Sequence, residues 1–126
     1  MLIRRPETME GEPMAMEGVK GVSKRLLVGR EDRAPTFSMR HFTVEPGGHT
    51  PRHSHNYEHE IYILEGTGRV EHAGEFHEIT AGDALLVEPN VIHQFVNVGD
   101  GPFKFLCFVP THFDCGADGT QPVPGS

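Results

Sequence analysis

The chain is divided into short runs of β-branched, aromatic and aliphatic residues, separated by sequences that favour turns. After residue 35 these runs cover 36–45, 51–56, 60–65, 68–72, 75–80, 84–88, 92–97 and 103–109. The sequences between them are rich in glycine, for example Glu45-Pro46-Gly47-Gly48, Glu65-Gly66-Thr67-Gly68 and Ala81-Gly82-Asp83. No helical periodicity persists for as many as ten residues. Several short strands bounded by glycine turns predict an all-β sandwich or barrel.

The two ends of the chain are less regular than its middle. Residues 1–30 are expected to form an N-terminal arm, in which residues 19–28 supply one strand. Residues 31–112 are expected to form the barrel, and the polar, Gly- and Pro-rich residues 113–126 a flexible tail. A length of 126 residues is typical of one domain that buries a core without disulfides.

Side-chain alternation along the runs predicts which residues face the inside of the barrel. Successive side chains of a strand point to opposite faces, so residues two apart share a face. If His59 faces inward, the aliphatic residues of 59–65 line the same cavity, and Lys104 marks the outer side of 103–109. The other residues expected to face inward are Ile61, Ile63, His93, Phe95, Asn97, Phe105, Cys107 and Val109. Leu106 and Phe108 then lie on the outer face and need a cover.

Charge and composition exclude several classes of protein. A formal net charge of −7 argues against a nucleic-acid or anionic-membrane partner, because both require a basic surface. No apolar run is long enough to span a bilayer, and the two arginines near the start precede no apolar segment of a secretory signal. The two cysteines, Cys107 and Cys115, are expected to be unpaired thiols. A cytoplasmic protein is therefore expected.

Four of the nine histidines form a candidate metal site: His53, His55, His59 and His93. A neutral imidazole offers a lone pair near physiological pH, which makes histidine the commonest metal ligand. His53 and His55 are two residues apart, so they point to the same face of a strand. The remaining five show no such spacing and are expected to be surface or turn residues; they are His41, His49, His72, His77 and His112.

The string His55-Asn56-Tyr57-Glu58-His59 also matches the H-x-x-E-H pattern of inverzincin peptidases. That pattern requires a helix, on which the two histidines share a face. Here Pro51 precedes the string, and the β-branched and aromatic residues 61–63 follow it directly. The local sequence therefore favours strands, and a peptidase site is not expected.

The glycines around the four histidines complete a recognisable pattern. The run Gly47-x5-His53-x-His55-x3-His59-x6-Gly66 resembles the first cupin motif, G-x5-H-x-H-x3/4-E-x6-G. The run Gly82-x5-Glu88-x-Asn90-x2-His93-x3-Asn97 resembles the second, G-x5-P-x-G-x2-H-x3-N. The resemblance covers residues 36–110 and is to single-domain, RmlC-like cupins. With histidine in place of the glutamate, the chain is similar to the small four-histidine, manganese-type bacterial cupins.

The sequence departs from the cupin motifs at three positions. His59 stands where the family has glutamate, and the adjacent Glu60 is the alternative ligand. His59 is preferred because it keeps the six-residue step to Gly66 and places Ile61 and Ile63 inside the barrel. Glu88 and Asn90 replace proline and glycine, and asparagine tolerates the left-handed backbone that such a turn requires.

The resemblance implies a jelly-roll barrel, or double-stranded β-helix, that holds a divalent transition metal with all four histidines. Manganese follows from the family likeness, whereas imidazole ligands also suit Fe, Zn, Ni or Co. Four neutral ligands leave the ion its full charge, which favours an anionic, chelating small molecule. The expected function is a metal-dependent isomerase, lyase or dioxygenase acting on a small anionic organic acid or sugar-derived substrate. The alternative is a binding or sensing module without turnover.

No nucleophile–base pair is visible, so catalytic residues beyond the metal ligands are not assigned. Depending on strand register, Arg40 or Met39 reaches the pocket; an inward Arg40 would pair with a substrate carboxylate, and an outward one would be a surface charge. Cys107 is expected to be a packed core thiol. Finally, an exposed sheet edge invites pairing, so we expect a homodimer in which residues 19–28 add a strand to the partner and help cover Leu106 and Phe108.

Overall fold

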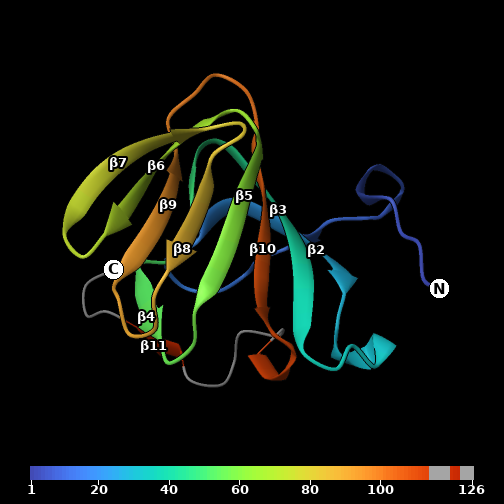
Figure 1. Ribbon diagram of the computed structural model, residues 1–126. Helices are drawn as coiled ribbons and strands as arrows, with labels where there is room; N and C mark the ends of the chain where they lie inside the picture. Colours follow the sequence, from blue (N-terminus) through green and yellow to red (C-terminus); the bar gives the residue numbers. More distant parts are fainter. Residues whose placement is uncertain (114–119, 123–126) are drawn as a thin grey trace.

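A computed structural model describes residues 1–113 and 120–122 of the protein (Figure 1). The strands of these residues are β1 (Glu12–Pro13), β2 (Lys20–Val28), β3 (Phe37–His49), β4 (His53–His55), β5 (His59–Glu65), β6 (Thr67–His72), β7 (Glu75–Thr80), β8 (Ala84–Val87), β9 (His93–Asn97), β10 (Phe103–Pro110) and β11 (Thr120–Pro122). Three short 3-10 helices are also described: η1 (Pro6–Thr8), η2 (Arg30–Asp32) and η3 (Thr111–Phe113). No helix of the described residues is long and apolar enough to cross a membrane.

The strands form one antiparallel sheet that curls around a central core (Figure 1). Its hydrogen-bonded order is β11-β4-β9-β3-β10-β5-β8, while β2 pairs with β3 and β6 lies between β7 and β9. Strands distant in sequence are thus neighbours, as in the pairing of β3 with β10. This arrangement confirms the predicted all-β jelly-roll barrel.

All eight predicted strand runs after residue 35 are strands in the structure, but the turn expected at Glu45-Pro46-Gly47-Gly48 is wrong. These residues lie inside β3, which continues to His49. Lys20 pairs with His49 and Val22 with Val44, so residues 45–48 lie opposite a single residue of β2. The extra residues form a bulge, which bends a strand without ending it.

The first residues of the expected N-terminal arm contact β2 and the turn that follows it. Arg4 donates hydrogen bonds to the Leu27 carbonyl at 2.7 Å and to both carboxylate oxygens of Asp32 at 2.8 Å. The Arg25 Nε–H donates to the Met9 carbonyl at 2.9 Å. Strand β2 pairs with β3 of the same chain, so the exchange of residues 19–28 between two chains stays a prediction. Most of the expected tail, including Cys115, lies outside the described residues, whereas β11 pairs with β4.

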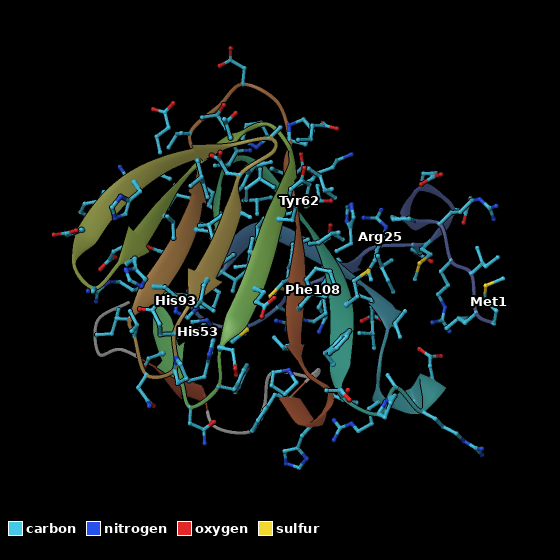
Figure 2. All side chains as sticks on the ribbon, in the orientation of Figure 1. Met1, Arg25, His53, Tyr62, His93 and Phe108 are labelled. Atoms are coloured by element: carbon cyan, nitrogen blue, oxygen red, sulfur yellow. The ribbon has the colours of Figure 1, made fainter. Side chains whose placement is uncertain are left out.

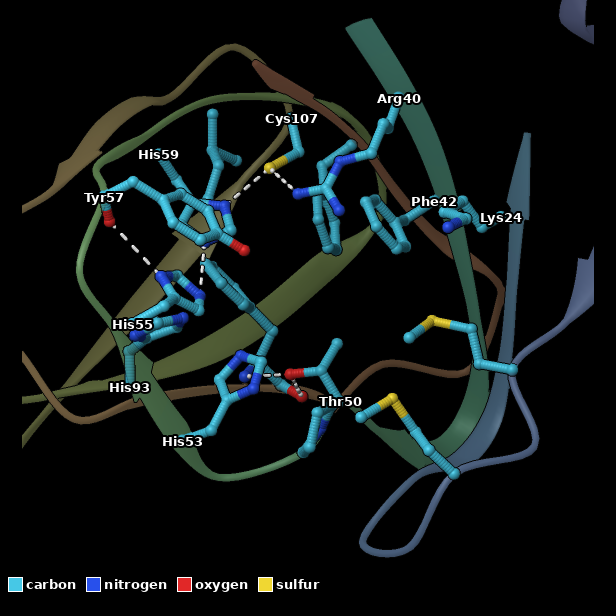
Figure 3. Close-up of a pocket in the computed structure, with 16 residues that line it drawn as sticks. Lys24, Arg40, Phe42, Thr50, His53, His55, Tyr57, His59, His93 and Cys107 are labelled. Atoms are coloured by element: carbon cyan, nitrogen blue, oxygen red, sulfur yellow. Dashed lines mark hydrogen bonds between the residues drawn. The ribbon is translucent and has the colours of Figure 1, made fainter. Parts of the chain in front are cut away.

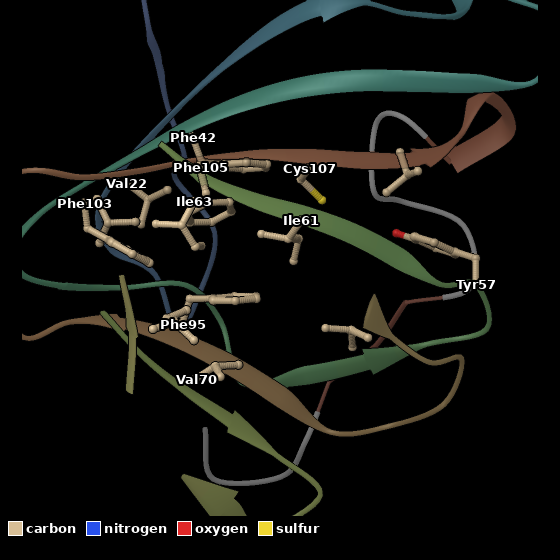
Figure 4. Packing of buried hydrophobic residues seen from close by; sticks show 14 residues of the cluster. Val22, Phe42, Tyr57, Ile61, Ile63, Val70, Phe95, Phe103, Phe105 and Cys107 are labelled. Carbon is tan, nitrogen blue, oxygen red and sulfur yellow. The ribbon is translucent and has the colours of Figure 1, made fainter. Parts of the chain in front are cut away.

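The core follows the predicted alternation of inner and outer side chains. In β10 every second residue is buried, from Phe103 to Val109, and in β5 His59, Ile61 and Ile63 are buried between exposed neighbours. The Phe105 ring packs 5.2 Å from Phe42, measured between ring centroids. Figure 4 shows this cluster extending along the barrel from Phe103 at one end to Tyr57 at the other.

One histidine expected at the surface is buried. His41 is only 7% exposed, because it lies in the middle of β3 between β2 and β10. Its Nδ1 atom has no hydrogen-bond partner in the described part of the chain. Burial lowers the pKa of His41, and the nearby Arg25 and Lys104 lower it further. The prediction failed because it took no account of the cover that β2 provides. His77 and His112 are exposed, as expected, and His49 and His72 are half-buried.

Candidate metal centre

The four predicted histidines come from three strands that meet at one end of the barrel. His53 and His55 lie on β4, His59 begins β5 and His93 begins β9. Strands β4 and β9 pair directly, with His53 opposite His93. The loop before His93 contains Asn90 with φ 66°, the left-handed conformation that asparagine tolerates. Two segments almost forty residues apart in the sequence are thereby brought into contact.

Three of these side chains form a compact group of nitrogen donors. One ring nitrogen from each of His53, His55 and His93 lies within 4.8 Å of the other two. His55 and His93 are each 2% exposed, so the donors are shielded from bulk water. Figure 3 shows the three rings gathered at one side of the pocket.

Backbone carbonyls orient two of the rings. The Nδ1 atom of His55 lies 3.3 Å from the Tyr57 carbonyl, and Nδ1 of His93 lies 2.9 Å from the Val91 carbonyl. A carbonyl only accepts, so each Nδ1 carries the proton and each Nε2 keeps its lone pair. This second hydrogen bond is the arrangement that typically fixes a metal-binding imidazole. Nδ1 of His53 is buried and lacks a hydrogen-bond partner in the described residues.

His59 contacts the three-histidine group through His55 and not through all three rings. Its Nε2 atom lies 2.6 Å from Nε2 of His55, and its Nδ1 atom lies 2.8 Å from the Cys107 sulfur. Two neutral imidazole nitrogens at this distance share a hydrogen bond, in which one ring donates its N–H to the lone pair of the other. Glu60, the alternative ligand, is exposed on the outer face of β5. The role of His59 as the fourth ligand stays a prediction.

Burial keeps the histidines of the site neutral. Desolvation, with the neighbouring histidines and Arg40, lowers the pKa of His53 to about 3. Desolvation with His93 and Arg40 lowers the pKa of His55 to about 4, against the Tyr57 carbonyl, which raises it. Burial lowers the pKa of His59 well below its usual value, and also lowers that of His93. The lone pairs are therefore available at neutral pH, as metal binding requires.

These pKa shifts predict acid sensitivity of the metal-free protein. An unfolded histidine binds a proton near pH 6.5, whereas His53 and His55 stay neutral in the fold until about pH 3 and 4. The unfolded state therefore binds more protons in this window, and stability should fall as pH decreases from about 6.5 to 4. Urea unfolding of the metal-free protein at a series of pH values measures this slope. The exposed His77→Ala should keep the slope, and His53→Ala should reduce it; an equal slope in His53→Ala would contradict the assignment.

The histidines open into a cavity of about 250 Å³ inside the barrel (Figure 3). Arg40 of β3 points into this cavity, whereas its neighbour Met39 lines a groove on the outer face. Tyr57 stacks on His55 with ring centroids 4.3 Å apart, and Phe113 stacks on its other face at 4.2 Å. The barrel thus contains a cavity with nitrogen donors on one wall.

Sequence reasoning missed several residues of this cavity. Met14, Met16 and Lys24 come from the segment around β1 and β2, and Thr50 from the loop before β4. The positions of Met14, Met16 and Lys24 depend on the pairing of β1 with β2 and of β2 with β3, which no local pattern of the sequence encodes.

The donors present fit a divalent transition metal. Neutral imidazole nitrogens suit Zn, Cu, Fe and Ni, and three converging donors leave coordination positions open on the cavity side. A site with open positions can bind a small molecule directly through its oxygens. The arrangement is thus capable of metal-dependent binding and of Lewis-acid chemistry.

Comparison with known proteins gives two curated relatives of partial length. Over 71 residues the chain is 37% identical to an uncharacterized protein of Methanocaldococcus jannaschii, covering 56% of this chain and 57% of that protein. Over 79 residues it is 30% identical to the 1-methylthio-D-xylulose 5-phosphate methylsulfurylase of Rhodospirillum rubrum, covering 63% of this chain and 51% of the enzyme. The chain therefore spans a little over half the length of these relatives.

The chain also resembles a solved structure over its full length. It is the polyketide cyclase RemF from Streptomyces resistomycificus, with a TM-score of 0.88 and 30% sequence identity. The match covers 100% of this chain and 87% of that protein. The profile of the cupin domain family, Cupin_2, matches residues 40–109, which include all four histidines and the strands that carry them. The chain belongs to the cupin superfamily.

Proposed function

We propose that this protein is a metal-dependent enzyme that acts on a small anionic carbonyl compound. The observation that carries the proposal is the group of three converging histidine donors, two of them buried, which opens into a cavity shared with the cationic side chain of Arg40. The two named relatives are both enzymes acting on small molecules, a polyketide cyclase and a methylsulfurylase of a sugar phosphate. Their names support an enzyme but differ in the reaction, so isomerase, lyase, cyclase and dioxygenase chemistry are all candidates.

His53, His55 and His93 would hold the metal, with His59 as the fourth ligand. A divalent ion bound there would stabilise negative charge on carbonyl or enolate oxygens of the substrate. Manganese is proposed from the likeness to four-histidine cupins, and Fe, Zn, Ni and Co are the alternatives that the donors allow. The protein's own contribution is to keep the imidazoles neutral, to fix their tautomers through backbone carbonyls and to keep bulk water away from the donors.

Metal analysis and turnover assays together test this function. The purified protein is expected to contain about one divalent ion per chain, and at least one reloaded metal form should turn over a compound from a panel of β-diketones, keto acids and uronates. Oxygen uptake and ultraviolet absorbance follow the reactions. If no metal form turns over any compound while a ligand still raises the melting temperature, the binding or sensing module replaces the enzyme.

Alanine substitutions of the adjacent residues His59 and Glu60 test which of the two is the fourth ligand. His59→Ala should lower metal affinity at least about tenfold, because a donor that lies against His55 is lost. Glu60→Ala should leave the affinity unchanged, because this side chain is exposed on the other face of β5. Competition with a chelator of known affinity measures both variants. The reverse result would assign Glu60 as the ligand.

We also propose that the protein is a cytoplasmic homodimer. Apolar side chains are exposed on the outer face of the sheet; Phe37 is 63% exposed, Leu86 57% and Tyr62 45%, and each lines a surface groove with the half-buried Phe108. Figure 2 labels Tyr62 and Phe108. A contiguous exposed apolar surface is typical of an interface. In the dimer, the β2–β3 pairing seen within one chain would form between two chains, which extends the sheet across the interface.

Deleting residues 1–28 should convert the dimer to a monomer or to aggregates, because the strand that pairs with β3 is lost. Light scattering coupled to size-exclusion chromatography measures the mass. Deleting residues 1–11 removes η1 but keeps β2, so this shorter deletion should remain dimeric. A dimer that survives the longer deletion would rule out this role of β2.

A further inference from the structure

The cavity combines polar side chains, among them the histidines and Arg40, with apolar walls. Besides the histidines and the charged or polar groups, the wall consists of aromatic and aliphatic side chains: Met14, Met16, Phe42, Pro51, Ile61, Phe95 and Phe105. A sugar would place hydroxyl groups against this wall, where they would lose their hydrogen bonds to water without replacement. A flat conjugated carbonyl compound carries its polar atoms at few positions and suits the wall better.

Arg40 carries a buried charge that has no carboxylate partner among the described residues. Its side chain is 6% exposed, and no carboxylate within residues 1–113 forms a salt bridge with it. Its Nε atom is buried and has no hydrogen-bond partner among the described residues. A buried guanidinium without an anion is costly, so such a group is typically balanced by a ligand.

Two contacts hold the guanidinium in place. Nη2 of Arg40 donates to the Cys107 sulfur at 3.1 Å, and the guanidinium lies over the Phe42 ring, 5.1 Å from its centroid. The Cys107 sulfur also contacts Nδ1 of His59, as the dashed lines in Figure 3 show. A chain of side-chain contacts therefore sets the position of the charge relative to the histidines. A fixed fork of N–H donors is the arrangement that recognises a carboxylate.

We propose that Arg40 selects the substrate: a conjugated carbonyl acid whose carbonyl oxygens chelate the metal and whose carboxylate pairs with Arg40. The apolar wall around Phe42 and Phe105 holds the body of the molecule. This inference rests on the proposed function, because it needs the metal at the histidines. It adds to that function a substrate class and the residue that recognises it.

Benzoylpyruvate and its methyl ester test the proposal. Both carry the β-diketone that chelates a metal, but only the acid has a carboxylate. Calorimetry with the zinc-loaded protein measures the two affinities, and their ratio is the readout. The wild-type protein should bind the acid at least about tenfold more tightly than the ester, as a charge-assisted hydrogen bond predicts. Arg40→Met should bring this ratio close to one.

Two further variants make the result specific. Arg40→Lys keeps the positive charge but loses the fork of N–H donors, so it should retain a reduced preference for the acid. This variant replaces Arg40→Met in the test if Arg40→Met does not fold. Lys24→Gln removes the other cation that lines the cavity and should keep the full preference. An unchanged ratio in Arg40→Met, or a ratio lost only in Lys24→Gln, would overturn the proposal.

The outcomes separate this inference from the proposed function. Zinc content, measured on each sample, shows whether the histidine site is loaded. A loaded wild-type protein that binds neither compound, or both equally, refutes the role of Arg40 and leaves the metal site standing. A protein that prefers the acid but turns over nothing refutes the enzyme and leaves the role of Arg40 standing.

Discussion

Replacing His55 with alanine is expected to lower the affinity for a divalent metal on the order of 100-fold or more. His55 is the centre of the donor group: its nitrogen belongs to the three-histidine group, and its Nε2 atom also lies 2.6 Å from His59. Loss of an outer hydrogen-bond partner of a metal ligand already costs roughly 10–100-fold. Removal of the donor itself should cost at least the upper end of this range.

Competition with a chelator, followed by metal analysis of the dialysed protein, measures the effect. His77→Ala is the matched control, because its side chain is exposed on β7 and lies outside the donor group. Circular dichroism of both variants without metal shows whether the fold is retained. If a folded His55→Ala protein kept wild-type metal affinity, the proposed metal centre would have to be abandoned.

Replacing Gly68 with alanine is expected to destabilise the fold by about 1–3 kcal/mol, and to lower Tm by roughly 4–12 °C. A Cβ atom at this position would lie 2.5 Å from the Phe103 ring, which is completely buried. An aromatic ring in a packed core has little room to move, so the strands must shift instead. Thermal and urea unfolding of the metal-free protein measure the change.

A second substitution shows whether the ring is the cause. Phe103→Leu frees space next to position 68, so the double variant should lose less stability than the sum of the two single variants. Gly101→Ala is the control, because an added Cβ there meets no atom within 4 Å. Additive losses in the double variant would place the cause outside the contact with Phe103.

Much of the fold could be predicted because it depends on local patterns. Strand β10 illustrates this: its alternation from Phe103 to Val109 is visible in the sequence and matches the burial in the structure. The bulge at residues 45–48 could not be predicted in the same way. Proline and glycine are typical of turns, and only the pairing of β2 with β3 shows that the strand continues past them.

The candidate site, too, could be predicted from the sequence only in part. The spacing of His53, His55 and His93 was enough to predict that they converge, since two share a strand face and the third lies in a paired motif. The direction of Arg40 was open, because residues 39 and 40 face opposite sides and strand register decides which one is inside. The burial of His41 was missed for a related reason: the strand that covers it lies about fifteen residues earlier in the chain.

Because Tyr57 stacks on His55, the intrinsic fluorescence of the protein can report metal binding. The chain has no tryptophan and two tyrosines, so tyrosine alone supplies its fluorescence in the near ultraviolet. Tyr62 is exposed on the outer face, whereas Tyr57 is buried and in ring contact with His55. A paramagnetic ion bound by His55 would quench the emission of Tyr57 and leave that of Tyr62 largely intact. Titration with metal can therefore be followed without any label, and Tyr62→Phe would isolate the signal of the inner tyrosine.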